Sequence, residues 1–147
     1  YLKQNYNIKG LLLKDEVAIF SNKKISQEIL KTVIGISSVA GERGKKNNNV
    51  YSSAKSGFSC YLDGLRQKIY NKGIHVITVK PGWVNTKMTK GLNLPKFMTV
   101  NSAYVGNKIF NSYKSKKNTL YVPGYWSIIM FVSSLSGRTM NQSLSMP

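Results

Sequence analysis

Residues 32–37 read TVIGIS, and this short stretch decides the fold of the chain. Its run of β-branched side chains is typical of a strand buried on both faces of a parallel sheet. A loop rich in glycine, lysine and asparagine follows over residues 39–49. Apolar residues then recur at helical spacing from Tyr51 to about Asn71, and Gly73 stands where such a helix would stop. We therefore predict a strand, a loop and a helix in succession.

The same alternation continues on both sides of this unit. Upstream, apolar residues over 7–22 predict a helix, which a polar connector joins to the strand. Downstream, IHVITVK (Ile74–Lys80) predicts a second strand. Three further elements are expected: a helix over 101–115, a strand over 119–123 and an aromatic helix over 125–135. Strands that alternate with helices predict an α/β fold in which right-handed crossovers build a parallel sheet.

Composition and charge indicate a single globular domain and argue against a nucleic-acid-binding protein. A chain of 147 residues, 41% of them apolar, is long and apolar enough to fold as one domain. The single cysteine, Cys60, excludes an internal disulfide and fits a reducing, cytoplasmic environment. The net charge is +17, but the basic residues are scattered in pairs and no nucleic-acid-binding signature occurs. We therefore expect no nucleic acid as a partner.

Several residues are predicted to meet at one edge of the sheet. Ligands of open α/β sheets bind beyond the carboxyl ends of the strands. Ser37 and Ser38 end the first strand, Pro81 and Gly82 follow the second, and Tyr51 begins the helix between them. We expect these residues to converge.

Tyr51 and Lys55 are four residues apart and share one face of the predicted helix. A phenol is a weak acid, and a neighbouring ammonium eases the transfer of its proton near neutral pH. The hydroxyl of Ser38 could donate a hydrogen bond to a carbonyl oxygen while the phenol protonates it. Hydride addition to a ketone needs this combination and a fixed hydride donor. A tyrosine–lysine pair alone also fits the solvated first turn of a surface helix.

Four motifs, taken together and in order, resemble the short-chain dehydrogenase/reductase family. They are NIKG at residues 7–10, ISSVAG at 36–41, YSSAK at 51–55 and PGWVNTKM at 81–88. The resemblance spans about residues 5–123 and implies a Rossmann-type, doubly wound parallel sheet that binds NAD or NADP. It further implies hydride transfer to or from a ketone or secondary alcohol.

The resemblance also implies roles for single residues. Tyr51 matches the family's general acid and base, Lys55 the residue that assists it and binds the nicotinamide ribose, and Ser38 the residue that polarises the carbonyl. Asn7 matches the residue that holds a water in a proton relay to Lys55. The matching cofactor-binding positions are Tyr51, Lys55, Pro81, Gly82, Val84 and Thr86. No His/Cys/Asp/Glu grouping in the sequence has metal-ligand spacing, so no metal is expected.

The sequence departs from the family at its start. The family's glycine-rich turn is absent, as is the residue that distinguishes NAD from NADP. The chain thus resembles the C-terminal part of a member: residues 1–123 match the later part of the NAD(P)-binding domain, and residues 124–147 form an aromatic helix and tail. Because the chain opens on Tyr1 rather than methionine, we expect further residues upstream. Such a part alone should bind dinucleotide poorly and expose an apolar sheet edge at residues 32–37.

A narrower resemblance is to decaprenylphosphoryl-2-keto-ribofuranose reductase-like members of the family. ISSVAGERG, VYSSAKSG and YVPGYWSIIM carry this resemblance. It implies a lipid-linked keto-sugar substrate and contact of the aromatic helix with the inner membrane surface. The same helix would equally fit a cover for the sheet or an oligomer contact. Family members are commonly homo-oligomers, and we expect the same of this protein.

Two other interpretations compete with the enzyme. One is a basic, non-enzymatic module that binds nucleic acid or an anionic membrane, and the other is an inactive, truncated remnant of a reductase. The strand-end Ser38 and the Pro81–Gly82 loop favour the enzyme over a binding module, which would need neither.

Overall fold

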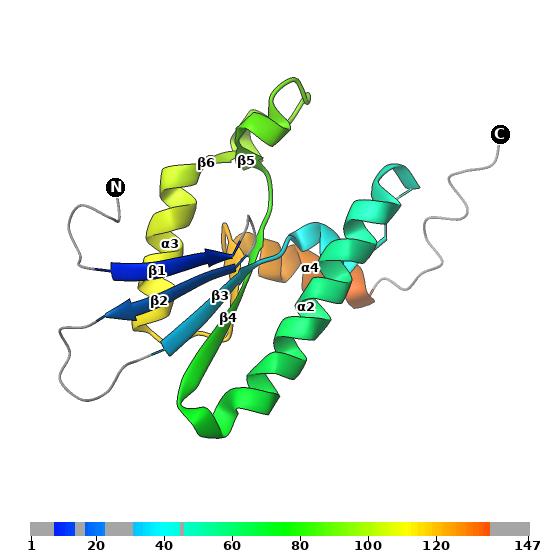
Figure 1. The fold of residues 1–147 in the computed structure, drawn as a ribbon. Helices are drawn as coiled ribbons and strands as arrows, with labels where there is room; N and C mark the ends of the chain where they lie inside the picture. The colour runs from blue at the N-terminus through cyan, green and yellow to red at the C-terminus, as the bar shows by residue number, and fades with distance from the viewer. Residues whose placement is uncertain (1–7, 14–16, 23–30, 45, 136–147) are drawn as a thin grey trace.

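The computed structural model describes residues 8–13, 17–22, 31–44 and 46–135 (Figure 1). At its centre lies a five-stranded sheet in the order β1-β2-β3-β4-β7. β3, β4 and β7 run parallel, whereas β1 and β2 continue the sheet as an antiparallel pair beside β3. The strands are β1 (Ile8–Leu13), β2 (Val17–Asn22), β3 (Lys31–Ile36), β4 (Ile74–Pro81) and β7 (Thr119–Val122).

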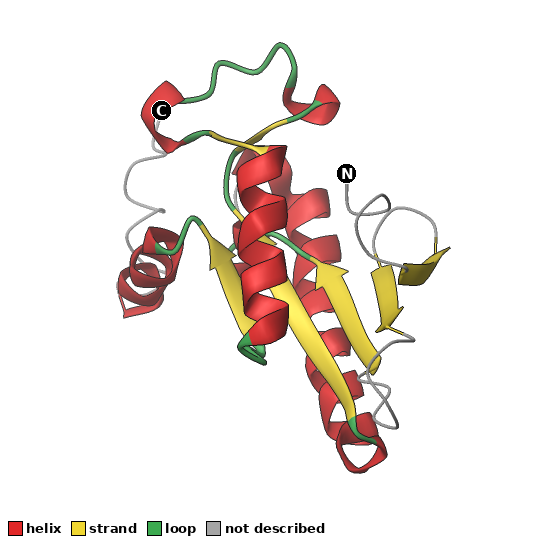
Figure 2. Ribbon diagram, turned by 90° about the vertical axis from the view of Figure 1, so that its left-hand side faces the viewer, coloured by secondary structure: helices red, strands yellow, loops and turns green. Residues whose placement is uncertain are grey.

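Helices cover both faces of the parallel strands. Figure 2 shows α3 (Ser102–Lys114) in front of the sheet and α2 (Asn49–Ile69) behind it. Four β-branched side chains from the parallel strands form the core between these layers: Ile34, Ile77, Val79 and Val122. This arrangement confirms the predicted Rossmann-type α/β fold, because each crossover between neighbouring parallel strands carries a helix.

Most downstream elements confirm the sequence-based predictions. The predicted strands are β3, β4 and β7, and the predicted helices are α2, α3 and α4 (Tyr125–Leu135). The helical segment from α2 ends at Gly73, whose φ of 63° lies in the left-handed region that glycine adopts without strain. Asn101 caps α3, since its side chain accepts a hydrogen bond from the Tyr104 amide at 2.7 Å.

The helix predicted over residues 7–22 is wrong. Residues 8–13 and 17–22 instead form β1 and β2, which pair with each other. In the sequence, two apolar runs flank the charged residues 14–16, and this is also the pattern of two strands and a turn. β2 pairs in turn with β3, so its backbone groups cover the edge of β3 that the sequence predicted to be exposed.

The segment after β4, which begins with the Pro81–Gly82 loop, contains short regular elements. β5 (Val84–Asn85) pairs in parallel with β6 (Val100–Asn101), and two short 3-10 helices, η4 (Lys87–Thr89) and η5 (Lys96–Met98), lie between them. Figure 1 shows this segment extending beyond the carboxyl end of β4. We call residues 87–98 the projecting loop. Across the described ranges, no helix combines the length and apolar character that crossing a bilayer requires.

Candidate active site

Ser38 is fixed where the carboxyl ends of β3 and β4 meet. It lies just past β3 and caps the short helix η1 (Val39–Glu42), because its Oγ accepts a hydrogen bond from the Ala40 amide at 3.1 Å. The same hydroxyl lies 3.4 Å from the Pro81 carbonyl oxygen, to which it donates. Ser38 is only 8% exposed. The predicted meeting of Ser38 and Pro81 therefore occurs in the structure.

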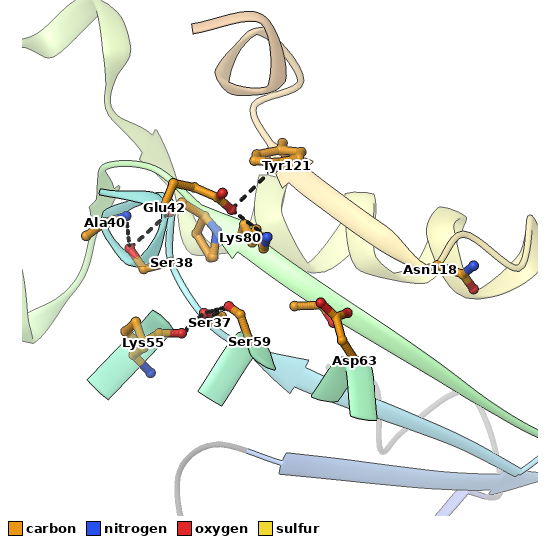
Figure 3. A network of polar contacts seen from close by, with 12 residues as sticks. Ser37, Ser38, Ala40, Glu42, Lys55, Ser59, Asp63, Lys80, Asn118 and Tyr121 are labelled. Atoms are coloured by element: carbon orange, nitrogen blue, oxygen red, sulfur yellow. Dashed lines mark hydrogen bonds and ion pairs between the residues drawn. The ribbon is translucent and has the colours of Figure 1, made fainter. Parts of the chain in front are cut away.

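Ser37 attaches helix α2 to the same strand end (Figure 3). Its Oγ donates to the Lys55 carbonyl at 2.9 Å and lies 2.7 Å from the Ser59 hydroxyl. Its amide donates to the Val79 carbonyl at 2.7 Å, which also ties it to β4. The sequence prediction treated Ser37 as a strand-end residue only and missed Ser59. The available signal was a small polar residue one helical turn after Lys55.

Lys55 brings its ammonium group to the end of β3. Its Nζ donates a hydrogen bond to the Ile36 carbonyl at 3.1 Å. The same Nζ lies 5.8 Å from the centroid of the Tyr51 ring, within the range of a cation–π contact. Both side chains are half-buried. Ser38, just past β3, and Lys55, bonded to the last residue of β3, are therefore each held at the carboxyl end of the sheet, and Tyr51 stands one helical turn before Lys55.

The loop from Pro81 to Thr86 is held from two sides. The Gly82 amide donates to the Val122 carbonyl at 2.8 Å, and a Cβ at Gly82 would overlap the Trp126 side chain. Trp126 also packs edge-on against Trp83, with ring centroids 5.4 Å apart. Glycine at this position makes room for α4, which packs directly against the loop.

The far end of this loop is braced by Thr89. Its Oγ1 donates to the Val84 carbonyl at 2.7 Å and accepts a hydrogen bond from the Thr86 amide at 2.9 Å. Val84 and Thr86 thus hold defined positions next to Pro81 and Gly82. Asn7, the remaining predicted site residue, lies outside the described residues.

A polar network that the sequence did not predict lies beside Ser38 (Figure 3). Glu42 forms an ion pair with Lys80 and accepts a hydrogen bond from the Tyr121 hydroxyl at 3.2 Å. Burial raises the pKa of the Tyr121 phenol above its ordinary range, Lys80 counteracts this, and Glu42 adds to it. Because Glu42 ends the short helix that Ser38 begins, this network fixes η1 against β4 and β7.

The geometry places proton donors at the carboxyl ends of β3 and β4. The Ser38 hydroxyl and Lys55 ammonium are positioned there, and the Tyr51 phenol lies one turn of α2 before Lys55. Within the described ranges, no three His, Cys, Asp or Glu side chains are grouped so that they could hold a metal ion.

The fold implies a nicotinamide dinucleotide, and these residues fit one end of it. The hydrogen-bond donors of Lys55 and Ser38 suit a ligand that carries sugar hydroxyls. The braced loop at Pro81–Thr86 suits a planar ring. The sequence contains no glycine-rich turn at a helix start, which is the feature that binds the pyrophosphate end of a dinucleotide.

The comparisons with known proteins agree on one family. The family model described as "short chain dehydrogenase" matches residues 18–96. An uncharacterized oxidoreductase of Mycobacterium tuberculosis is 30% identical over 103 residues, which are 69% of this chain and 40% of that protein. The acetoacetyl-CoA reductase of Allochromatium vinosum is 43% identical over 61 residues, or 42% of this chain and 25% of the relative. The chain therefore spans well under half the length of these relatives.

A solved structure has a similar fold. It is a short chain dehydrogenase from Burkholderia cenocepacia in complex with NADP. The TM-score is 0.68 at 14% identity, and the match covers 80% of this chain and 50% of the other. At this identity the likeness is one of fold.

Proposed function

This chain belongs to the short-chain dehydrogenase family, and from that premise we propose that the complete protein is an NAD(P)-dependent oxidoreductase. Its reaction is hydride transfer to or from a ketone or secondary alcohol. The observation that supports this most is that Ser38 and Lys55 are hydrogen-bonded to the carboxyl ends of two neighbouring strands, β4 and β3, with the Lys55 ammonium over the Tyr51 ring. By the complete protein we mean this chain with any upstream segment encoded with it.

The roles of the chain's own residues follow from their chemistry. Ser38 donates a hydrogen bond to the carbonyl oxygen of the substrate, and Tyr51 gives that oxygen its phenolic proton as the carbonyl carbon is reduced. Lys55 binds the ribose hydroxyls and places its positive charge beside the phenol. Asn7 holds a water that returns a proton toward Lys55. Pro81, Gly82, Val84 and Thr86 border the nicotinamide ring, and the cofactor, when bound, supplies the hydride.

The substrate carries its ketone next to a larger group. The relatives' names include an acetoacetyl-CoA reductase and a ketoacyl reductase, which favours a 3-ketoacyl compound. A lipid-linked 2-keto-sugar is a second candidate, favoured by the apolar side chains that α4 and the projecting loop expose beside the site. The two candidates share the ketone and differ in what carries it.

The decisive experiment is an assay of the complete protein for NADH and NADPH oxidation. The substrate panel contains acetoacetyl-CoA, a polyprenyl-phosphate-linked 2-keto-sugar and the same keto-sugar without its lipid. Turnover of one ketone with one cofactor would support the proposal and identify the class of substrate. If the pure protein binds neither dinucleotide and oxidises neither with any ketone, it is not a reductase, and a basic binding module or an inactive remnant would be the better description.

A further inference from the structure

Helix α4 has two faces, and the outward one is apolar. Toward the protein, Trp126 is only 5% exposed, and the Ser133 hydroxyl and carbonyl accept hydrogen bonds from the Arg43 guanidinium at 3.0 and 3.3 Å. Four residues at helical spacing form the outward stripe, which we call the α4 stripe: Ile128, Phe131, Val132 and Leu135. Their exposed fractions are 54–71%. Helices on the surface of a globular protein normally carry polar residues on this face.

The η5 end of the projecting loop lies next to α4. The Tyr125 hydroxyl, at the start of α4, donates to the Met98 carbonyl at 3.2 Å and joins the two segments. In Figure 2, η5 and α4 both lie on the β7 side of the sheet. The loop exposes three apolar side chains, Met88, Leu92 and Phe97, whose exposed fractions are 61–88%.

The charged residues of the projecting loop have one sign. Residues 87–98 contain Lys87, Lys90 and Lys96 and no acidic residue, and α4 contains no charged residue. Arg43 contacts α4 from the protein side. Apolar side chains interspersed with lysines match the chemistry of an anionic lipid surface, in which acyl chains lie beneath negatively charged headgroups.

From this complementarity we infer that the α4 stripe and the projecting loop form a docking surface for an anionic membrane. A second copy of the chain would bring the same three lysines to the contact, and like charges would oppose it. An upstream segment of a longer chain would join on the other side, because β1 lies at the opposite edge of the sheet from β7. Neither of these occupants matches the surface as a lipid headgroup layer does.

Docking would place the candidate site at the lipid surface. Trp126 of α4 packs against Gly82 and Trp83, which belong to the loop that borders the site. A substrate whose ketone is carried on a membrane lipid would then reach the site from the headgroup layer. This consequence rests on the proposed reductase function, whereas the membrane binding does not.

The test is sedimentation of the complete protein with vesicles, in the absence of cofactor and substrate. Vesicles of phosphatidylcholine with about 30% phosphatidylglycerol, a composition chosen for its negative surface charge, are compared with phosphatidylcholine alone. The triple variant Ile128→Ser/Phe131→Ser/Leu135→Ser removes most of the stripe. The variant Lys87→Gln/Lys90→Gln/Lys96→Gln leaves α4 intact. The matched control is Val50→Ser/Tyr70→Ser, because these two exposed apolar residues lie elsewhere, in α2 and the turn after it.

We expect the native protein and the control to bind the anionic vesicles, and both test variants to bind them at least tenfold more weakly. Binding should also fall when the salt concentration is raised from about 0.1 to 0.5 M, because the headgroup attraction is screened. Circular dichroism checks the fold, and the lysine variant remains decisive if the stripe variant fails to fold. No binding to anionic vesicles, or equal binding by the native protein and the lysine variant, would overturn the inference. So would a stable dimer that the stripe variant converts to a monomer. The reductase assay with a water-soluble ketone is independent, so failure of either proposal can be recognised separately.

Discussion

Ser37 and Ser38 are neighbours at the end of β3, yet each holds a different element. Ser38 bonds to η1 and to the end of β4, while Ser37 bonds to α2 through the Lys55 carbonyl. Motif position predicted that Ser38 faces the site edge, but the anchoring role of Ser37 depends on Lys55 and Ser59, which are 18 and 22 residues away in the chain. Partners at such distances leave no local pattern in a sequence.

Substitution of Tyr51 should slow ketone reduction without weakening the binding of the cofactor. In the complete protein, Tyr51→Phe removes the proton donor and retains the ring, so we expect ketone reduction to fall by about 10²–10⁴-fold. Cofactor affinity, measured by the fluorescence of bound NAD(P)H, should change little. Lys55→Ala should weaken both, because Lys55 serves the phenol and the ribose. Undiminished turnover by Tyr51→Phe would mean that another group donates the proton.

Tyr121 should make stability depend on pH in the alkaline range. An unfolded tyrosine loses its proton near pH 10, whereas burial raises the pKa of Tyr121 in the folded protein. Above about pH 10 the folded state therefore holds more protons than the unfolded state, and the free energy of unfolding falls as pH rises. The stabilising contribution is fully present below that pH.

The variant Tyr121→Phe isolates this contribution. It should lower the free energy of unfolding by about 1 kcal/mol at pH 8, because the hydrogen bond to Glu42 is lost. The difference from the native protein should shrink as the pH rises above about 10, the pKa of an unfolded tyrosine. Urea unfolding at several pH values measures it, with Tyr70→Phe as the control, since Tyr70 is 78% exposed. A difference that stays constant up to pH 11 would contradict the burial argument.

At the scale of elements, the sequence predicted what local patterns can encode. β3 and β4 are short β-branched runs, so their sequences predict strands. α2 has apolar residues at helical spacing and a glycine where the helical segment ends, so its sequence predicts a helix. β1 and β2 could not, because their apolar runs fit a helix or two strands, and pairing with β3 selects the strands. The contact of Glu42 with Tyr121 spans 79 residues and depends on the finished sheet.

The close packing of η1 against α2 gives a prediction at this scale. A Cβ at Gly41 would lie 2.8 Å from the Lys55 carbonyl carbon and from the Ser56 nitrogen, which are backbone atoms and cannot rotate away. Gly41→Ala should therefore push α2 from the strand end and lower the free energy of unfolding by about 1–3 kcal/mol. Gly44→Ala is the matched control, because a Cβ there meets no atom within 4 Å. Thermal or urea unfolding of the two variants makes the comparison, and equal stability would show that η1 adjusts freely.

At the scale of the whole molecule, two properties can be predicted: the oligomeric state of the protein and the dependence of its activity on an upstream segment. The sequence predicts two helices that could carry the expected contact between subunits, one at residues 7–22 and one starting at Tyr51. Only the second of these is a helix in the described residues. Of these two segments, α2 is therefore the one that remains as a helical contact between subunits.

We expect the complete protein to form a homo-oligomer through the outward face of α2. Tyr61 lies on this helix and is 62% exposed, a large aromatic side chain in a position that a partner would bury. Tyr61→Glu should shift the assembly toward the monomer in sedimentation or light scattering at micromolar concentration. Tyr70→Glu, just beyond the helix, is the control. A native protein that is strictly monomeric would remove this expectation.

The chain should also depend on an upstream segment for activity. Its three parallel strands position Ser38, Tyr51 and Lys55, but the sequence has no glycine-rich turn to bind a pyrophosphate at a helix start. Without that turn the cofactor would not be held with its nicotinamide beside Tyr51, and a hydride donor that is not fixed in place loses the large advantage of proximity. We expect the 147-residue chain alone to bind NAD(P)H weakly and to oxidise none in the presence of a ketone. The same chain, extended by an upstream nucleotide-binding unit, should do both. Cofactor titration and absorbance assays on the two proteins make the comparison, with Tyr51→Phe in the extended protein to show that the restored turnover uses this site. Turnover by the bare chain would mean that residues 1–147 already bind the whole dinucleotide by a route other than the family's glycine-rich turn.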